Sequence, residues 1–350
     1  MQHRIQNEQH LRQLISAPPA LLEKRVQTQL DAYCFEVINH ARGMIVASES
    51  GTPALQPVSL SHCQLDVTAN SVRFSLPEAD EQPDLQTDKQ ADRQADRQAD
   101  RQANHGHSGQ NASLYFLIPG VGHALRVNGR LSRQLPQGHW QLQVKSAYLH
   151  CARAAVRSGL WDNETEHSAA VLTDSTRYLQ QAMYLLLKTC DAQGITSVSP
   201  RGDETGVIRM LPDGRLFMAE RPGNKVALSL RNLLQNPALE LLLLIPGQPQ
   251  LLHICGSAQL TTEPQLLAAC AISDKVPKLG LLIEPQAIRF TSASALTDAG
   301  VFNPEHRVEA KQLTPFAKAL SAHMSGEGLM GKATHLVVDQ VVKHDLKNLY

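Results

Sequence analysis

Two parts of this chain read as copies of each other, and this internal repeat most constrains the fold. The stretch LIPGVGHALRVNGRL, residues 117–131, parallels LIPGQPQLLHICGSA, residues 244–258. Two further pairs of segments correspond in the same way: residues 44–60 with 184–200, and residues 147–162 with 288–303. Alternating apolar residues bounded by turn signals predict strands in both copies. The repeat therefore predicts two similar β domains in tandem.

The second copy contains a stretch, Ile195 to Pro237, that is suited to binding an anion. Two strand-like runs flank Pro212-Asp213-Gly214, which predicts a hairpin. Asn224 precedes apolar residues at helical spacing, so it is predicted to be the N-cap of a helix. The first N–H groups of a helix carry partial positive charge, and Arg221 and Lys225 flank them here. The arrangement suits a phosphate, although a Gly-Asn turn before a helix commonly serves only as a cap.

The motifs of this stretch occur in a specific order. Residues 198–203 read VSPRGD, residues 221–224 read RPGN, and Asn236-Pro237 precedes a strand at residues 239–245. In this order they resemble the pyridoxamine 5'-phosphate oxidase-like family, the FMN-binding split barrels. The resemblance implies six-stranded antiparallel barrels, with FMN between two of them. Together with the repeat it implies a mainly β protein with flanking helices (α+β), in which two tandem split β-barrels pack as a pseudo-dimer within one chain.

The two copies keep different parts of the family pattern. The first copy has VSLSHC at residues 58–63 in place of VSPRGD, and it lacks RPGN. It keeps the family's RVNGR strand at residues 126–130 and the segment from His150 to Trp161, with Arg153 where the family usually has Lys. The second copy keeps only the phosphate elements. This reciprocal loss predicts one composite FMN site that draws on both copies. The alternative is that the retained residues serve only the core or the domain interface.

The resemblance assigns the predicted cofactor-binding residues to three roles. The phosphate is assigned to Arg209, Arg221, Asn224 and Lys225, the edge of the flavin ring to Ser197 and Ser199, and closure of the site to Arg157 and Trp161. Arg201 belongs to the predicted set as well, with the alternative that Arg201 and Asp203 form an ion pair that fixes a loop. Trp161 has the alternative of being a core anchor. No residue is assigned a catalytic role.

The predicted organisation has four parts. They are an N-terminal helical segment at residues 1–42, a first split barrel at 43–162, a second split barrel with the phosphate motif at 163–303, and a C-terminal helical tail at 304–350. The first barrel contains a low-complexity insertion at about residues 78–110, in which the unit ADRQ repeats. This insertion has no aliphatic residue larger than Ala in its repeats, so it is predicted to be solvated and mobile.

Composition excludes several classes of function. Lys plus Arg and Asp plus Glu are equal at 33 each, which argues against a nucleic-acid binder that relies on bulk charge. No apolar run is long enough for a transmembrane helix, and the start of the chain lacks the apolar core of a signal peptide, so a cytoplasmic location is expected. The six cysteines are scattered without a CxxC pair, and no metal site is expected.

The sequence leaves two main functions open. The first is an FMN-dependent oxidoreductase that acts on an unidentified small-molecule substrate. The second is a non-catalytic split-barrel protein that holds a flavin or haem. A pure assembly module is a third alternative. The phosphate elements favour flavin over haem, because haem has no phosphate. Since the pseudo-dimer lies within one chain, a monomer or a weak homodimer is expected.

Overall fold

The described residues form two antiparallel sheets of seven strands each. The computed structural model describes residues 3–49, 55–75, 109–134, 139–162 and 170–350. The first sheet, in the first half of the chain, has the order β2-β1-β5-β6-β7-β4-β3. Its strands are β1 (Gly43–Ser48), β2 (Leu55–Ser59), β3 (Asp66–Thr68), β4 (Ser71–Phe74), β5 (Gln110–Leu117), β6 (Ala124–Gln134) and β7 (His139–His150).

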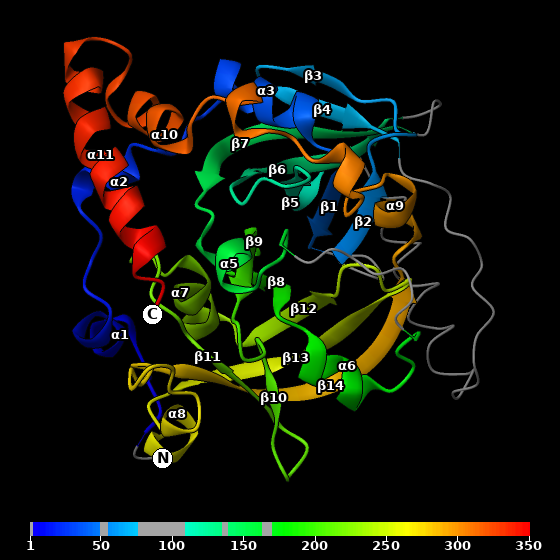
Figure 1. Cartoon of the computed structure of the whole chain (residues 1–350), viewed down its shortest axis with the longest axis vertical. Coiled ribbons are helices and arrows are strands. Elements are labelled where there is room, and N and C mark those ends of the chain that lie inside the picture. The colour runs from blue at the N-terminus through cyan, green and yellow to red at the C-terminus, as the bar shows by residue number, and fades with distance from the viewer. Residues whose placement is uncertain (1–2, 50–54, 76–108, 135–138, 163–169) are drawn as a thin grey trace.

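The second sheet, in the second half, has the order β9-β8-β12-β13-β14-β11-β10. Its strands are β8 (Tyr184–Cys190), β9 (Thr196–Gly202), β10 (Arg209–Met210), β11 (Leu216–Ala219), β12 (Ala238–Leu244), β13 (Gln250–Thr261) and β14 (Gly280–Ser292). Strand for strand this is the order of the first sheet, with β8 in the place of β1 and β9 in the place of β2. Figure 1 shows the two sheets one above the other.

The repeat extends to an irregularity in the ladder. The pairing of β6 with β7 shifts register between Asn128 and Gly129, and the pairing of β13 with β14 shifts between Cys255 and Gly256. These glycines are counterparts in the sequence repeat. A Cβ on Gly129 would lie 2.0 Å from the Gln143 carbonyl oxygen, so only glycine fits the bulge. The predicted fold class, an α+β protein with two tandem barrels, is confirmed.

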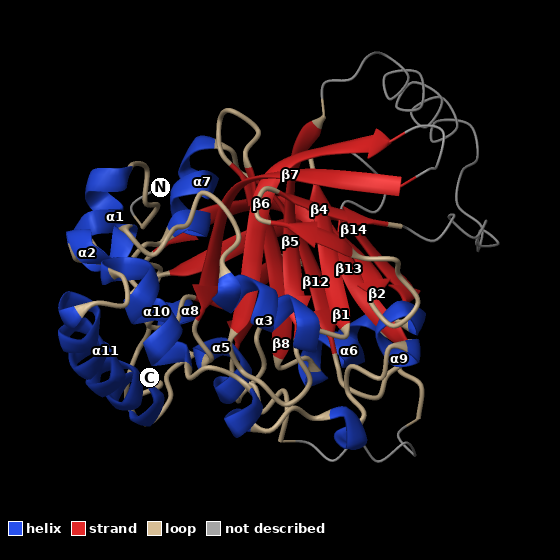
Figure 2. Cartoon of the chain, turned by 90° about the horizontal axis from the view of Figure 1, so that it is seen from above, coloured by secondary structure: helices blue, strands red, loops and turns tan. Residues whose placement is uncertain are grey.

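Helices surround the sheets. They are α1 (Glu8–Leu14), α2 (Ala20–Glu23), α3 (Ala32–His40), α5 (Arg153–Arg157), α6 (Ser175–Gln181), α7 (Leu228–Gln235), α8 (Pro264–Ala268), α9 (Ser294–Asp298), α10 (Phe316–Ser325) and α11 (Leu329–Lys347), with 3₁₀ turns at Pro304–His306 and Ala310–Gln312. Helices from both ends of the chain, α1, α2, α10 and α11, lie on the same side of the sheets (Figures 1 and 2). Among the described residues, none of the helices combines the length and hydropathy that crossing a membrane requires.

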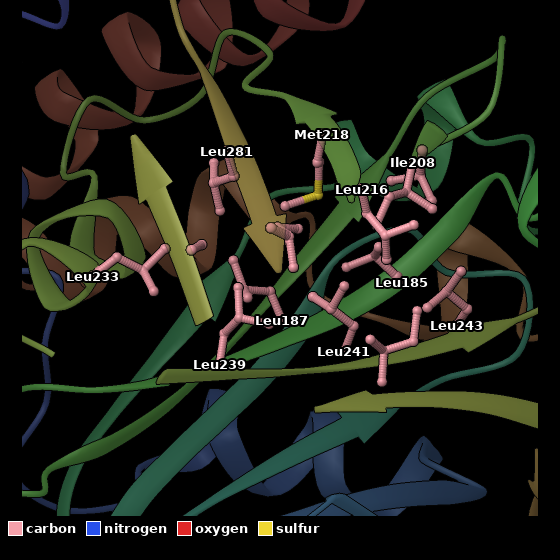
Figure 3. Close-up of a cluster of buried hydrophobic side chains, with 14 of the residues drawn as sticks. Leu185, Leu187, Ile208, Leu216, Met218, Leu233, Leu239, Leu241, Leu243 and Leu281 are labelled. Carbon is pink, nitrogen blue, oxygen red and sulfur yellow. The ribbon is translucent and has the colours of Figure 1, made fainter. Parts of the chain in front are cut away.

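Each half has its own apolar core, and a third core joins the halves. Along β8, Leu185 and Leu187 point into the core of the second half (Figure 3). The alternate residues Tyr184 and Leu186 belong to the shared core, where they meet side chains of the first half such as Ile45. A strand buried on both faces needs a continuous apolar run, which explains the sequence YLLL. The two halves are therefore held together by apolar burial.

Short helices are exchanged between the halves. Helix α5 of the first half packs on β9 of the second, and its counterpart α9 packs on β2 of the first. Trp161 and Phe302, which are counterparts in the repeat, stack with their ring centroids 5.5 Å apart. Two equivalent residues can meet only close to an axis that relates the halves, so the chain is arranged as the pseudo-dimer that its repeat predicts.

Two local expectations need comment. Asn224 is not the N-cap of a helix: α7 begins at Leu228, and its N-cap is Ala227, with a left-handed φ of 54°. The Asn224 side chain instead accepts a hydrogen bond from the backbone N–H of Val226 at 3.1 Å, an Asx turn that competes with helix formation. The predicted low-complexity insertion, up to residue 108, lies outside the described residues.

Candidate functional site

A cavity of about 420 Å³ lies where the two halves meet. Most of its lining comes from residues 14–16 and Arg25, from residues between Tyr148 and Arg157, from residues 199–203, from residues 219–229, from residues 275–279 and from Tyr350. The segment from Tyr148 to Arg157 is the end of β7 together with α5, in the first half. Residues 199–203 end β9 and residues 219–229 lead into α7, both in the second half. The cavity is therefore shared between the halves.

The two halves approach each other closely at this cavity because of a glycine. A Cβ on Gly202 would lie 1.9 Å from the carbonyl oxygen of Ala154 and 3.1 Å from the Cβ of Ser158. Gly202 ends β9, and Ala154 is in α5. The absence of a side chain at residue 202 lets the backbone of α5 rest directly on β9, which brings the basic side chains of α5 to the cavity.

Two ion pairs organise the part of the cavity that comes from the second half. Arg201 contacts Glu220, with 3.2 Å between Nε and Oε2, and it donates to Ser229 Oγ at 2.6 Å. The Nε of Arg221 contacts Asp203 Oδ2 at 2.5 Å, in a pair whose members are both nearly buried. The sequence allowed an ion pair between Arg201 and Asp203. Both residues do form ion pairs that hold this loop, but with other partners.

The first half contributes two arginines that contact the C-terminal segment. Arg157 donates through Nε to the Leu349 carbonyl at 2.8 Å, and it also donates to the Pro222 carbonyl. Arg153 pairs with Asp345 at 2.8 Å. The Tyr350 ring lies against the guanidinium groups of Arg157 and Arg221, at 5.5 and 5.1 Å. Burial, with the charge of Arg153, lowers the pKa of Arg157 to about 10.

Arg126 is a buried cation next to the cavity wall. Its side chain is inaccessible to solvent, and it donates to the carbonyl of Val198 in the other half at 2.5 Å. Its guanidinium lies 4.3 Å from the ring centroid of Tyr148, which lines the cavity. Its Nε and a second terminal nitrogen have no hydrogen-bond partner among the described residues. Burial, followed by the charge of Arg25, lowers the pKa of Arg126 to about 9.

His150 is a neutral imidazole in the cavity wall. Burial lowers its pKa well below the ordinary value, and the nearby charges of Arg126, Arg25 and Arg201 lower it further. Its Nε2 is buried without a hydrogen-bond partner among the described residues. Buried polar atoms are normally paired, because an unpaired one costs about 1–3 kcal/mol. The cavity wall therefore contains His150 and has Arg126 behind it, and both carry buried polar atoms that no described residue satisfies.

Six of the nine predicted cofactor-binding residues line the cavity. They are Arg157, Ser199, Arg201, Arg221, Asn224 and Lys225. The other three do not. Ser197 is hydrogen-bonded to Asn232 at 3.2 Å behind the cavity wall, and Arg209 donates to the Ala269 carbonyl. Trp161 stacks on Phe302 in the shared core, which agrees with its alternative as a core anchor.

The sequence did not single out several residues at the cavity. Arg126 and His150 stand within motifs that were noted, RVNGR and the segment to Trp161, but the motifs gave them no role. Arg25 lies just after α2, and Tyr350 follows α11. Nothing in the pattern of either segment indicates that it reaches the junction of two β domains. Only the fold brings them there.

The strand order, the exchanged helices and the shared cavity define a class of protein: two split barrels of the pyridoxamine 5'-phosphate oxidase-like fold, joined in one chain. No family model matches the sequence, and no curated protein matches it. The chain is similar to several solved structures, each over about a third of its length. Because their TM-scores are low, the fold class rests on this chain's own strand order and register.

Three of these solved structures carry names that refer to different ligands or activities. HutZ, the heme storage protein from Vibrio cholerae, is 16% identical, with 35% of this chain and 95% of that chain covered and a TM-score of 0.28. HupZ from Group A Streptococcus is 16% identical, with 35% and 96% covered and a TM-score of 0.29. An F420 reductase is 18% identical, with 32% and 94% covered and a TM-score of 0.25. Each is a likeness of fold alone.

Proposed function

We propose that the cavity binds one FMN per chain and that the protein is an oxidoreductase-like flavoprotein for an unidentified small substrate. The observation that carries the proposal is that one cavity collects basic side chains from both halves, Arg157 from the first and Arg221 and Lys225 from the second. Its volume of about 420 Å³ lies in the range of small-molecule sites, about 300–1,000 Å³. An FMN phosphate is the ligand group that this charge suits best.

The residues at the cavity fit a phosphate in three ways. Helix α7 starts at the cavity with Leu228 and Ser229, and no side chain in the described part of the chain caps its N-terminus. Its first N–H groups are therefore available to an anion. Lys225 is exposed beside them and adds a positive charge. Arg201 and Arg221 are held in place by Glu220 and Asp203, so binding does not require them to lose much side-chain freedom.

The first half supplies the rest of the proposed site. The neutral His150 and the Tyr148 ring give a mixed apolar and polar wall of the kind that surrounds ring-shaped ligands. Bound FMN supplies electron transfer, and the protein supplies position and charge. Arg126, held beside this wall by the Val198 carbonyl, favours negative charge in the cavity. No side chain is assigned to proton transfer with a substrate.

Haem is a second candidate because of one observation. The Nε2 of His150 is buried without a partner among the residues that the structure describes, and the depressed pKa of the imidazole keeps it neutral. A neutral imidazole nitrogen is the usual axial ligand of haem iron. The visible absorption spectrum of the protein titrated with each cofactor separates the two candidates. A Soret band that shifts in His150→Ala, without any flavin binding, would replace the first proposal by the second.

Flavin titration of the purified protein tests the main proposal. FMN fluorescence quenching is measured for the parent, Lys225→Ala and Arg209→Ala. Loss of the Lys225 charge from the cavity should weaken binding about 10-fold, equivalent to about 1.4 kcal/mol. Arg209→Ala is the matched control, since it removes a cation of the same half that does not line the cavity. Equal weakening by both variants, or no quenching of FMN by the parent, would contradict the proposal.

A further inference from the structure

A second cluster of chemically active side chains lies on β12 and β13, and none of its members lines the cavity. Glu240 on β12 stands directly opposite Cys255 on β13, and His253 precedes Cys255 by two residues. His253 Nε2 is 2.9 Å from Glu240 Oε2 and 3.9 Å from Cys255 Sγ. One ligand atom from each of the three residues lies within 4.8 Å of the others. The three atoms therefore lie close enough together to contact one ion.

The cluster is sheltered on one face of the second sheet. The neighbouring residues along the two strands, such as Leu239, Leu241 and Ile254, point into the core of the second half. Because side chains alternate along a strand, Glu240, His253 and Cys255 share the opposite face. The His253 side chain is 1% exposed and that of Glu240 is 18% exposed. The site is thus shielded from bulk water but remains within reach of a small ion.

The corresponding position in the first half has different chemistry. In the alignment of the two copies, Arg126 is the counterpart of His253 and Asn128 is the counterpart of Cys255. Ser113 pairs with Asn128 in the ladder as Glu240 pairs with Cys255, and Ser113 Oγ donates to Asn128 Oδ1 at 2.8 Å. A neutral hydrogen bond at this place in the barrel is therefore sufficient to hold the fold. The second half has a carboxylate, an imidazole and a thiol there instead.

Two cations border the cluster and leave its ligand atoms accessible. Lys188 bonds to the other carboxylate oxygen of Glu240, Oε1, at 2.7 Å, so Oε2 is left to the cluster. Arg289 is exposed and its guanidinium is 3.9 Å from Cys255 Sγ, which is a weak contact that the side chain can leave. A carboxylate and a thiolate together balance the charge of a divalent cation, and Lys188 stays on Oε1 as an outer partner.

A second group with similar residues, Asp31, Cys34 and His323, serves as an internal comparison. Asp31 caps α3 by accepting from the Cys34 backbone N–H at 2.9 Å, and its other oxygen contacts His323 at 2.8 Å. Cys34 is inaccessible to solvent. Asp31 and His323 therefore already have a structural task, which is to hold the start of α3 against α10. This group is the natural control for the first.

We propose that Glu240, His253 and Cys255 bind a zinc-class divalent cation. Oxygen, nitrogen and sulfur donors together suit Zn²⁺, which favours tetrahedral sites of this composition. The three side chains supply three ligands and leave a fourth position for water or an added ligand, which is the arrangement of zinc sites with chemical activity. Binding displaces the protons of the thiol and of any imidazolium, so the affinity should rise with pH.

Cobalt titration of the full-length, metal-free protein tests this site. Co²⁺ bound to a thiolate gives a charge-transfer absorption in the near ultraviolet, and difference spectra separate it from any flavin. The parent should develop this band with one equivalent of Co²⁺ per chain and lose it when Zn²⁺ is added. Cys255→Ser should abolish the band. Glu240→Gln should weaken Zn²⁺ by at least about 10-fold, since even outer partners of metal ligands change affinity by about 10- to 100-fold.

Cys34→Ser is the matched control and should leave the band and its stoichiometry unchanged. Thermal melting in metal-free buffer shows whether each variant is folded, and Glu240→Gln keeps the test valid if Cys255→Ser does not fold. The proposal is overturned if the parent shows no thiolate band with Co²⁺. It is equally overturned if the band persists in folded Cys255→Ser, or if Cys34→Ser removes it.

Discussion

Where the two halves meet, single polar side chains are buried in environments that disfavour their charged form. Arg126 is inaccessible to solvent with a pKa lowered to about 9, and His150 is neutral with an Nε2 that no described residue pairs. Leaving polar atoms of this kind without partners costs stability, and such costs concentrate at functional sites. We interpret the pair as groups prepared for an anionic ligand that has an aromatic ring, since one supplies charge and the other supplies a neutral polar contact.

His123 should make stability depend on pH in the acid range. It packs against Phe316, and burial lowers its pKa to about 4. Unfolded histidine has a pKa of about 6.5, so between these values only the unfolded chain takes up the proton. The free energy of unfolding should therefore fall as pH falls from 6.5 to 4, by up to about 1.4 kcal/mol per pH unit from this residue.

The variant His123→Phe keeps an aromatic ring against Phe316 and removes the titration. Urea unfolding between pH 7.5 and 4.5 should show a shallower loss of stability for the variant than for the parent, with similar values at pH 7.5. If the free energy of unfolding depends on pH in the same way in both proteins, the effect cannot be assigned to His123. The pH dependence of the free energy of unfolding that remains in the variant should include the contribution of His150, whose pKa is also lowered.

Sequence reasoning located those cavity-lining residues that stand in contiguous motifs. VSPRGD and RPGN placed Arg201 and Arg221 at the cavity, and the segment after His150 placed Arg157 there. Sequence reasoning did not predict the position of Arg209, which stands between the two motifs. Arg209 lies on a two-residue strand and donates to the Ala269 carbonyl instead of lining the cavity. Sequence reasoning also could not find Tyr350, because that contact depends on the path of α10 and α11 across the whole molecule.

At the scale of elements, the repeat predicted more than local signals did. The alignment of residues 117–131 with 244–258 placed the bulge glycines Gly129 and Gly256 opposite each other, and the ladders shift register at both. The hairpin around Gly214 was also predicted correctly, with φ at 83° in the turn. The start of α7 was wrong, because Lys225 and Ala227 both take left-handed conformations that delay the helix.

Gly202 should be essential for the contact between α5 and β9. Its missing side chain allows the Ala154 carbonyl to approach, so Gly202→Ala must push α5 away from β9. We expect a loss of about 1–3 kcal/mol in the free energy of unfolding, as for other overpacked sites, together with weaker FMN binding. Gly223→Ala is the control for stability alone, since the nearest atom to its Cβ would be 4.0 Å away but the residue itself lines the cavity. Denaturant unfolding measures the loss of stability and flavin titration measures the loss of FMN binding by Gly202→Ala. Equal losses of stability in the two variants would contradict the packing argument.

At the scale of the whole molecule, the chain is a dimer-like arrangement with two unequal junctions. At one junction, α5 meets β9 and the cavity forms with its basic residues. At the counterpart junction, α9 brings Leu296 and Val301 against Gly43, whose added Cβ would lie 2.9 and 2.8 Å from them. Arg42 there donates to the Ala299 carbonyl at 3.2 Å. Apolar packing fills this junction and Arg42 is bonded to a backbone carbonyl, so we expect one composite FMN site per chain.

The measurement that tests this account most directly is FMN titration of Arg157→Ala, with Arg130→Ala as a control in the same half. Arg157 lies in the first half, while the phosphate motifs lie in the second. If the site is composite, the parent should bind one FMN per chain and Arg157→Ala should bind about 10- to 150-fold more weakly, equivalent to about 1.5–3 kcal/mol. Arg130 is exposed and bonded to Asn111, so its removal should have no effect. Parent-like binding by folded Arg157→Ala, or two equivalents of FMN per chain, would contradict a single site shared by the two halves.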